Sequence, residues 1–438
     1  MTTAVEQIAT APAHRDVAWL REALQSAIAL EHSTLPLYTA SMLSLEVQNY
    51  TTYNVIRSVL MEEMVHMAIA ANMLAALGGT PRIRDLDPGY PRFGLPGGVE
   101  PDLQVGLAKL SKRQLANFMR LEAPFFLLAP EHTTESYPTI GRLYLAIKDA
   151  INGNADEVRA AFAAGGPANQ VGDNIGFNTF SPDLPMDPIE QLNRGIDEIL
   201  EQGEGSLAGQ LTAGPEFQNE ESHYGRFAEL YYGATYHDPG GTPLTRETEP
   251  LFFAGAEIPW PEVINTLAVP SDGYERIVKL DPDSAAVAGE LAAFDDIYRS
   301  MLDALQKMWI GPAELIWPTF GQAVEAMMKL RVFSSFTFMR REIPRLLIDR
   351  LPELYPEEFG FLVRYTDLAE PVFYGPNVDA AFDAITGLYL VKDTLARTDE
   401  PPDRSLQRLR DLLDAHMTAD GVLFESRAWI ISAERARD

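Results

Sequence analysis

The chain has 438 residues, no cysteine and a formal net charge of −28 at pH 7. This length allows a large hydrophobic core and two domains. The negative charge disfavours nucleic acids and anionic membrane surfaces as partners, because both would repel the chain. The absence of cysteine excludes disulfides, thiolate metal ligands and cysteine nucleophiles.

The N-terminal segment MTTAVEQIATAPAHRDVAWL has no basic region followed by an apolar run, so it does not have the pattern of a secretory signal. No apolar stretch is expected to have the length and composition of a membrane span. We therefore expect a cytoplasmic protein whose partners are small molecules.

Two long helices are predicted at the start of the chain, over 15–47 and 51–78, because apolar residues recur there at helical spacing. Pro36 predicts a kink in the first helix, and Gly78 with Gly79 closes the second. The short polar link between them makes the two helices antiparallel neighbours. Further helices are predicted over 111–128, 139–152, 187–203 and 216–232, separated by loops at 80–108 and 164–186.

The stretch HDPGGTPLTRETEP, residues 237–250, indicates a domain boundary. We expect residues 1–238 to form a four-helix bundle and residues 239–438 to form a helical domain without a metal site of its own. That second domain could cover the bundle, shape a substrate pocket or form an oligomer interface. Its helices are predicted over 284–308, 313–333, 335–352, 376–397 and 403–417, and no run of alternating strands is predicted.

Polar residues interrupt the apolar face of the second long helix. Glu63 and His66 lie on the stripe that also carries Val59, Met67 and Ala70. A buried carboxylate is unfavourable unless it is paired or bound to a metal, and a histidine three residues later on the same face is a natural co-ligand. Glu62 points about a quarter-turn away and is expected to face solvent.

The other helices of the bundle repeat this anomaly. Glu31 lies on the apolar stripe of the first helix, and Glu122 lies on that of the helix over 111–128. Glu220 and His223 repeat the Glu-x-x-His spacing on the helix over 216–232, where the neighbouring Glu221 points elsewhere. Four helices thus each direct a carboxylate inward, and two of them add a histidine.

Four carboxylates and two imidazoles form an oxygen-rich site for two divalent ions, which suits iron or manganese better than zinc. Bundles of the di-iron and dimanganese carboxylate type contain this set of ligands. We therefore expect an all-α, ferritin-like four-helix bundle. Glu63 and Glu220 are expected to bridge the two ions, and the full predicted ligand set is Glu31, Glu63 and His66 for one ion and Glu122, Glu220 and His223 for the other.

Three more residues lie near these motifs. Tyr38, seven residues after Glu31, either borders the metal site or is an ordinary core tyrosine. Glu204 is either a further ligand or substrate contact, or a surface residue at a helix end. His32 is expected at the surface or behind a ligand.

With these residues in view, the first half resembles the ferritin-like domain of the iminophenyl-pyruvate dimer synthase type, found in bacterial pathways to tryptophan-derived pigments and indolocarbazoles. The resemblance spans about residues 15–235. It is carried by AIALEHSTLPLY, VLMEEMVHMAIAANMLAALGGTP, FMRLEAP, EQGEG and ESHYGRF.

The resemblance implies a non-haem dimetal oxidoreductase with two iron ions, or two manganese ions. Such an enzyme would use O₂ or peroxide as co-substrate, and an external reductant where needed, to oxidise a small aromatic or amino-acid-derived metabolite of a natural-product pathway. Coupling of two imines derived from aromatic 2-oxo acids is the named activity of the family, but this chain is much shorter than the multidomain pigment enzymes. Metal storage or detoxification, a catalase-like dimanganese protein and a homo-oligomeric assembly stay open.

Overall fold

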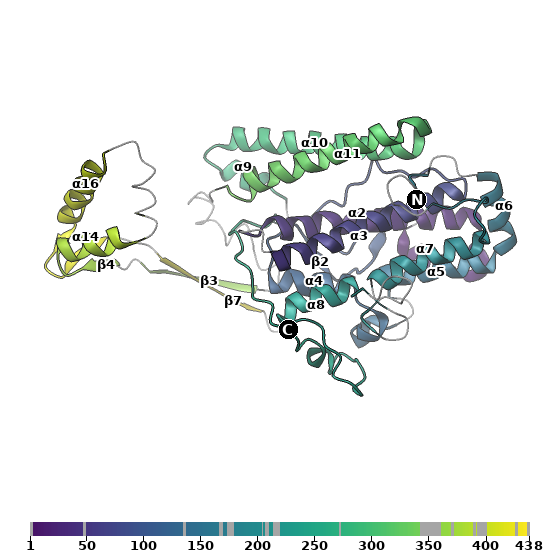
Figure 1. The fold of residues 1–438 in the computed structure, drawn as a ribbon, viewed down its shortest axis with the longest axis horizontal. Coiled ribbons are helices and arrows are strands. Elements are labelled where there is room, and N and C mark those ends of the chain that lie inside the picture. Colours follow the sequence, from purple (N-terminus) through teal and green to yellow (C-terminus); the bar gives the residue numbers. More distant parts are fainter. Residues whose placement is uncertain are drawn as a thin grey trace. The chain divides into compact units, whose positions relative to one another are not determined.

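Helices make up most of the first part of the chain in the computed structural model, which confirms the predicted fold class (Figure 1). The chain divides into two compact units, Met1–Asp349 and Arg350–Asp438. The structure describes residues 3–46, 50–134, 137–165, 170–172, 179–203, 205, 210–212, 220–270, 273–341, 361–368, 372–388, 391, 401–424 and 428–435.

The two longest bundle helices, α2 (Val17–Leu43) and α3 (Tyr50–Ala76), lie side by side as predicted. Asp16 caps α2 by accepting a hydrogen bond from the backbone of Trp19. Helix α2 continues through Pro36 as a single helix. Gly78, with a φ of 76°, ends α3 in the left-handed conformation that favours glycine.

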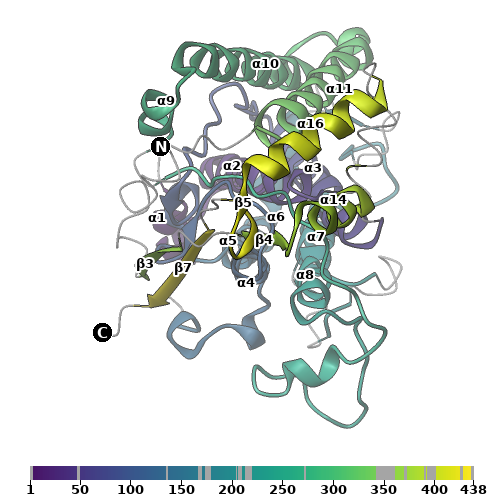
Figure 2. The same ribbon diagram turned by 90° about the vertical axis from the view of Figure 1, so that its left-hand side faces the viewer.

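Two shorter helices occupy each of the other two positions of the bundle. Helices α4 (Lys112–Leu121) and α8 (His223–Tyr232) pack together along one half of the α2–α3 pair. Helices α5 (Ile140–Gly153) and α7 (Pro188–Gly203) pack together along the other half. Figures 1 and 2 show these four helices on one side of α2 and α3. The bundle is therefore interrupted on two of its four sides.

These interruptions correct two predicted helix boundaries. The helix predicted over 111–128 ends at Leu121, because Pro124 cannot continue it. Within the described residues, the helix predicted over 216–232 begins at His223, because the Ser222 side chain accepts a hydrogen bond from the backbone of Gly225 and caps the helix there. Residues 216–219 of that prediction lie outside the described residues. Ser111 and Thr139 cap α4 and α5, at the positions where these two helices are predicted to begin.

A helical hairpin covers the opposite side of α2 and α3 (Figures 1 and 2). It consists of α10 (Ser284–Ile310) and α11 (Ile316–Phe333). The Gln306 side chain accepts a hydrogen bond from the backbone of Ile83 at 2.6 Å and donates one to Pro81 at 2.7 Å. These contacts explain why the predicted boundary after residue 238 falls inside the first unit: the hairpin is fastened to the bundle.

The second unit contains strands that the sequence analysis did not predict. Strands β3 (Phe361–Leu368) and β7 (Ala428–Arg435) pair antiparallel, and β6 (Gly421–Phe424) pairs with both β4 (Val372–Gly375) and β5 (Met417–Thr418). The partners β3 and β7, and likewise β4 and β6, are distant in the sequence and leave little local signal, because strand preference depends on tertiary packing. Among the described residues of this unit, the helices are α14 (Val378–Gly387) and α16 (Pro402–Ala415). Residues 342–352 of the helix predicted over 335–352 and residues 389–390 and 392–397 of the helix predicted over 376–397 lie outside the described residues.

Short elements complete the described chain. They are α1 (Ala4–Ala9), η1 (Pro12–His14), β1 (Arg92–Phe93), η2 (Pro96–Gly98), β2 (Gln104–Val105), η3 (Phe125–Leu127), η4 (Pro130–His132), α6 (Ala155–Gly165), η6 (Glu249–Phe252), α9 (Glu275–Leu280), η7 (Ala313–Leu315) and η8 (Ser334–Phe338).

Among the described residues, one helix has the length and composition of a membrane span, contrary to the sequence-based expectation. Residues Thr51–Ala76 of α3 contain a window with a mean hydropathy of 1.3, and 78% of that window is buried inside the protein. The apolar character of α3 is therefore explained by its position inside the bundle.

Replacing Gln306 with alanine tests how strongly the hairpin is fastened. We expect Q306A to lower the free energy of unfolding by about 2 kcal/mol, because two buried backbone groups lose their partner. Urea titration followed by circular dichroism measures this. Q322A, at an exposed position of α11, should change the value by less than about 0.5 kcal/mol. Equal effects of the two variants would contradict the assigned role of Gln306.

Candidate metal centre

Glu63 lies at the centre of a buried group of ionisable side chains. Its side chain projects from α3 and is only 2% exposed. Thr34 donates a hydrogen bond to Oε2 at 2.8 Å. The other oxygen, Oε1, lies 2.7 Å from Nδ1 of His223 and 3.9 Å from Nδ1 of His66. One carboxylate oxygen therefore faces both histidines.

The two histidines are oriented by different partners on their outer nitrogens. Nε2 of His66 lies 2.8 Å from Oε1 of Gln202, and Nε2 of His223 lies 3.0 Å from Oε2 of Glu62. The rings stack with centroids 5.2 Å apart. Glu63, His66 and His223 each offer a ligand atom within 4.8 Å of the others. Histidines held in this way at one nitrogen are typical of metal sites.

Glu31 and Glu122 flank this group on opposite sides. Oε2 of Glu31 lies 3.9 Å from Nδ1 of His66, and Oε2 of Glu122 lies 3.6 Å from Nδ1 of His223. Each carboxylate accepts a short hydrogen bond on its other oxygen, from Tyr144 to Glu31 and from Tyr38 to Glu122. The five predicted ligands Glu31, Glu63, His66, Glu122 and His223 are thus brought together, with Tyr38 beside them.

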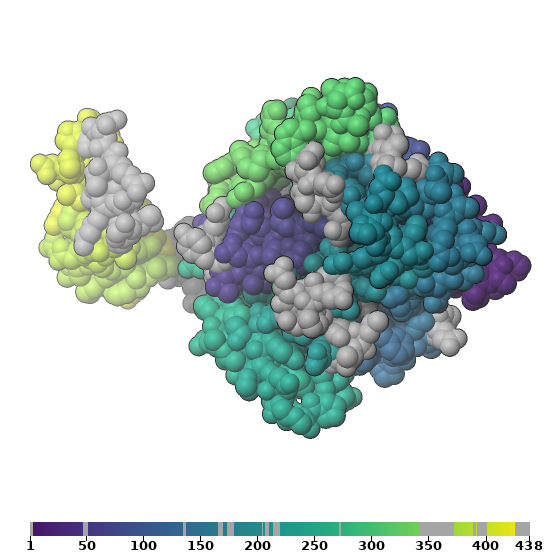
Figure 3. Space-filling view, turned by 45° about the vertical axis from the view of Figure 1, so that its right-hand side comes forward, coloured from purple at the N-terminus to yellow at the C-terminus, as the bar shows by residue number. Residues whose placement is uncertain are grey.

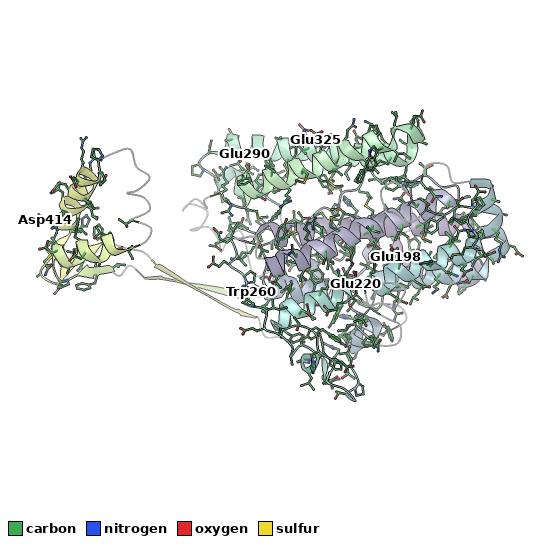
Figure 4. All side chains as sticks on the ribbon, viewed as in Figure 1. Glu198, Glu220, Trp260, Glu290, Glu325 and Asp414 are labelled. Atoms are coloured by element: carbon green, nitrogen blue, oxygen red, sulfur yellow. The ribbon has the colours of Figure 1, made fainter. Side chains whose placement is uncertain are left out.

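Glu220 is not brought into this group. Its side chain is 49% exposed, and its Oε2 lies 3.4 Å from the Arg226 guanidinium (Figure 4). The prediction placed Glu220 on a helical stripe, but the residue precedes the capped start of α8, so helical spacing does not apply to it. Glu62, expected to face solvent, instead contacts His223 and accepts a hydrogen bond from Arg226 at 2.7 Å.

Sequence reasoning did not identify Tyr144, Gln202, Glu62 or Arg226 as neighbours of the site. Gln202 belongs to the EQGEG motif that carried the family resemblance, which was the one available signal. Glu204 of that motif lies outside the described residues. The adjacent Gly203 lies against the site, because a Cβ atom there would be 3.5 Å from Oε2 of Glu122.

His32, the neighbour of Glu31, was predicted at the surface or behind a ligand, and its burial excludes the first alternative. Its Nε2 lies 2.7 Å from the hydroxyl of Tyr298 on α10. Burial lowers the pKa of His32 to about 4. The ring is therefore neutral at pH 7, and it links the outer hairpin to the helix turn that carries Glu31.

The protein groups of the site shift one another's pKa values in different directions. Burial raises the pKa of Glu31 and of Glu122, and the negative charge of Glu63 raises both further. Burial also opposes ionisation of Glu63, but the close approach and attraction of His223 outweigh it and lower the pKa of Glu63 to about 2. Burial disfavours the charged form of His223, yet contacts with Glu122, Glu62 and Glu63 raise its pKa.

The donor set fits a divalent cation. Nδ1 of His223 is buried and has no hydrogen bond of acceptable geometry, although it lies 2.7 Å from Oε1 of Glu63. Such a nitrogen is unfavourable unless another group uses its lone pair. Carboxylate oxygens and imidazole nitrogens that converge in a dry interior are ligands that iron and manganese accept. Residues Glu31, Glu63, Glu122, His66 and His223 could therefore hold metal.

Comparison with known proteins identifies the fold that carries these residues. Residues 24–232 match the family model described as Ferritin-like. The bundle has a ferritin-like fold. A solved structure, a ferritin-like protein from Caulobacter vibrioides, covers 74% of this chain and 96% of its own chain, with a TM-score of 0.51 and 21% identity. The resemblance to ferritin-like proteins predicted from the motifs is confirmed.

A curated enzyme is similar over part of the ferritin-like region. The 2-imino-3-(indol-3-yl)propanoate dimerase of Chromobacterium violaceum is 29% identical over 177 residues, which is 39% of this chain and 16% of the dimerase. The match therefore spans a small part of that enzyme's length.

Glutamine substitutions distinguish the role of Glu63 in metal binding from that of Glu220. We expect E63Q to lose most of the iron or manganese that the wild type retains after desalting, because this carboxylate faces both histidines. E220Q should retain it, because Glu220 is half exposed and paired with Arg226. Elemental analysis per chain measures both. Loss of metal in E220Q with retention in E63Q would reverse the assignment.

Alanine at Glu62 tests how His223 is oriented. We expect E62A to weaken metal affinity by about 10- to 100-fold, the usual effect of removing the partner of a ligating histidine. Competition with a chelator of known affinity gives this value. E190A, an exposed residue on α7, serves as control, and an unchanged affinity in E62A would contradict the assigned role of Glu62.

Proposed function

We propose that this chain is a non-haem dimetal oxidoreductase that uses O₂ or peroxide to oxidise a small aromatic or amino-acid-derived metabolite. Two iron ions, or two manganese ions, would be held by Glu31, Glu63, Glu122, His66 and His223. The observation that carries the proposal is the position of Glu63, whose Oε1 faces a histidine on either side. Bound ions would supply one-electron redox chemistry and Lewis acidity.

Some protein groups would bind such ions, and others orient the side chains that bind them. Glu63 can serve both halves of the site, whereas Glu31 and Glu122 each have one oxygen directed at a histidine and one held by a tyrosine. The two tyrosine hydroxyls therefore orient the flanking carboxylates. Gln202 and Glu62 fix the ring orientation of His66 and His223, so that both Nδ1 atoms are presented to the interior.

An aromatic wall excludes water from the Glu122 side of the site. Tyr38, Phe118 and Phe227 pack with ring centroids 4.7–5.2 Å apart, and each is at most 1% exposed. Electrostatic interactions are strong in such a dry, low-dielectric environment. Among the described residues, the Tyr38 hydroxyl donates its hydrogen bond to Glu122. A closed apolar surrounding of this kind supports chemistry in which reactive species must be kept from solvent.

The relative from Chromobacterium violaceum supports an aromatic substrate, since its name specifies an indole-bearing imino acid. Imines and 2-oxo acids derived from aromatic amino acids are therefore the first substrate class to test, and coupling of two such molecules is one form that the oxidation could take. The α10–α11 hairpin and the second unit distinguish the chain from single-bundle storage subunits.

The test is oxygen consumption by metal-loaded protein. Protein reconstituted with Fe(II) or Mn(II) is mixed with an imine generated in place from an aromatic amino acid, with a reductant added or withheld. We expect substrate-dependent uptake of O₂ or peroxide and a product of altered mass, both at background in E63Q. Accumulation of many iron atoms per chain would favour storage, and rapid peroxide disproportionation without substrate would favour a catalase-like protein; either result would contradict the proposal.

A further inference from the structure

Helix α11 is apolar on the side that faces away from the bundle as well as on the side that faces it. Ala323 and Ala326 are at most 6% exposed and pack inward. The outward residues form a set that we name the α11 stripe. Its members on α11, with their exposed fractions, are Trp317 (59%), Val324 (38%), Met328 (49%) and Val332 (53%), and Phe336 (72%) of η8 follows them.

Helical geometry places the α11 stripe on one face. On α11 itself, Trp317, Val324, Met328 and Val332 are seven, four and four residues apart, which is the spacing of one side of a helix. Gly321 lies on the same face, and a Cβ atom built there would meet nothing within 4 Å. A contiguous exposed apolar patch marks an interaction site.

We propose that a second copy of this chain covers the α11 stripe, with the two α11 helices antiparallel across a two-fold axis. The chain as a whole carries a net charge of −28, which opposes self-association over most of its surface. Helix α11 is an exception, since its charged residues are Glu325, Lys329 and Arg331. Two copies can therefore meet here without bringing acidic surfaces together.

The order of these charges fits an antiparallel pair. Glu325 and Lys329 lie on the same flank of the stripe and form an ion pair at 2.7 Å within the helix, in the outer layer of the first unit (Figure 4). If the two-fold axis passes near Met327, Glu325 of each copy lies opposite Lys329 of the other. The symmetry of a closed dimer produces this contact twice. A parallel pair would not place these residues on facing flanks.

The area available agrees with a dimer interface. An aromatic side chain has about 150–250 Å² to bury, so the exposed fractions of Trp317 and Phe336 leave roughly 250 Å² of apolar surface per copy. The aliphatic members bring the stripe to roughly 500 Å², against about 800 Å² per partner in a standard interface. The stripe thus supplies an apolar centre, and the flanking charges supply the polar rim. The hairpin forms one edge of the first unit in the space-filling view (Figure 3).

Sedimentation and light scattering of the full chain test the proposal. We expect a particle of twice the 48.5 kDa monomer mass at micromolar concentration. M328E should raise the dissociation constant at least about 100-fold, because each copy would bury a charge in an apolar interface. L251E, at a 56% exposed leucine outside the stripe, is the matched control. A monomeric wild type would overturn the proposal, including the case in which the second unit of the same chain shields the stripe.

A charge exchange tests the antiparallel arrangement. E325K alone should weaken the dimer by about tenfold, because a lysine would face Lys329 of the other copy. The double variant E325K/K329E should restore wild-type association to within about twofold. Equal weakening in the single and double variants would exclude the proposed register.

The absence of cysteine allows a direct contact test. M328C should form a disulfide-linked dimer under mild oxidation, whereas L251C should stay monomeric in denaturing electrophoresis. Cross-linking in both variants to the same extent would indicate random collision and contradict the interface. Metal content should be unchanged in M328E, so a failure of this proposal is distinguishable from a failure of the proposed function.

Discussion

Buried negative charge is the constraint on which the rest of the bundle depends. Glu31, Glu63 and Glu122 are each at most 6% exposed, and carboxylates in such an interior are unfavourable unless each finds a partner. Tyr144, Thr34 and Tyr38 each satisfy one oxygen. The remaining oxygens converge on Nδ1 of His66 and His223. The protein thus satisfies the outer side of every carboxylate and leaves the inner side directed at a common centre, which is the arrangement that a pair of cations would stabilise.

The interrupted helices follow from the same constraint. Glu122 is the residue that follows the last turn of α4, and His223 is the first residue of α8. Both side chains therefore project from helix ends, where the backbone direction changes, instead of from continuous helices. This brings Gln202, at the end of α7, and Glu62, on α3, close enough to hold the two histidines. Two continuous helices supply Glu31, Glu63 and His66, and two helix ends supply the rest.

This division explains how much could be predicted from the sequence. The inward position of Glu31, Glu63 and His66 could be predicted because α2 and α3 are long and regular, so that helical spacing alone identifies their inward face. Glu220 was misplaced because the same spacing was extended beyond the Ser222 cap. Tyr144 is 113 residues from Glu31 in the sequence, and no local sequence pattern predicts such a contact. The contact of Glu62 with His223 could not be predicted, because it forms only when α8 packs against α3. The inward faces of the regular helices were predictable, whereas the shortened ends of α4 and α8 and the long-range partners were not.

The outer hairpin connects these buried contacts with the molecular surface. On its inner side, Tyr298 reaches His32, next to Glu31, and Trp309 donates a hydrogen bond to Asn72 of α3 at 2.9 Å. On its outer side, α11 presents an apolar stripe. A partner bound to this stripe would restrain α11, and through it α10, whose tyrosine contacts the residue beside a flanking carboxylate. Close-packed helices transmit such restraint because they cannot shift independently. Association with a second copy would thus affect the surroundings of Glu31 through the α10–α11 hairpin.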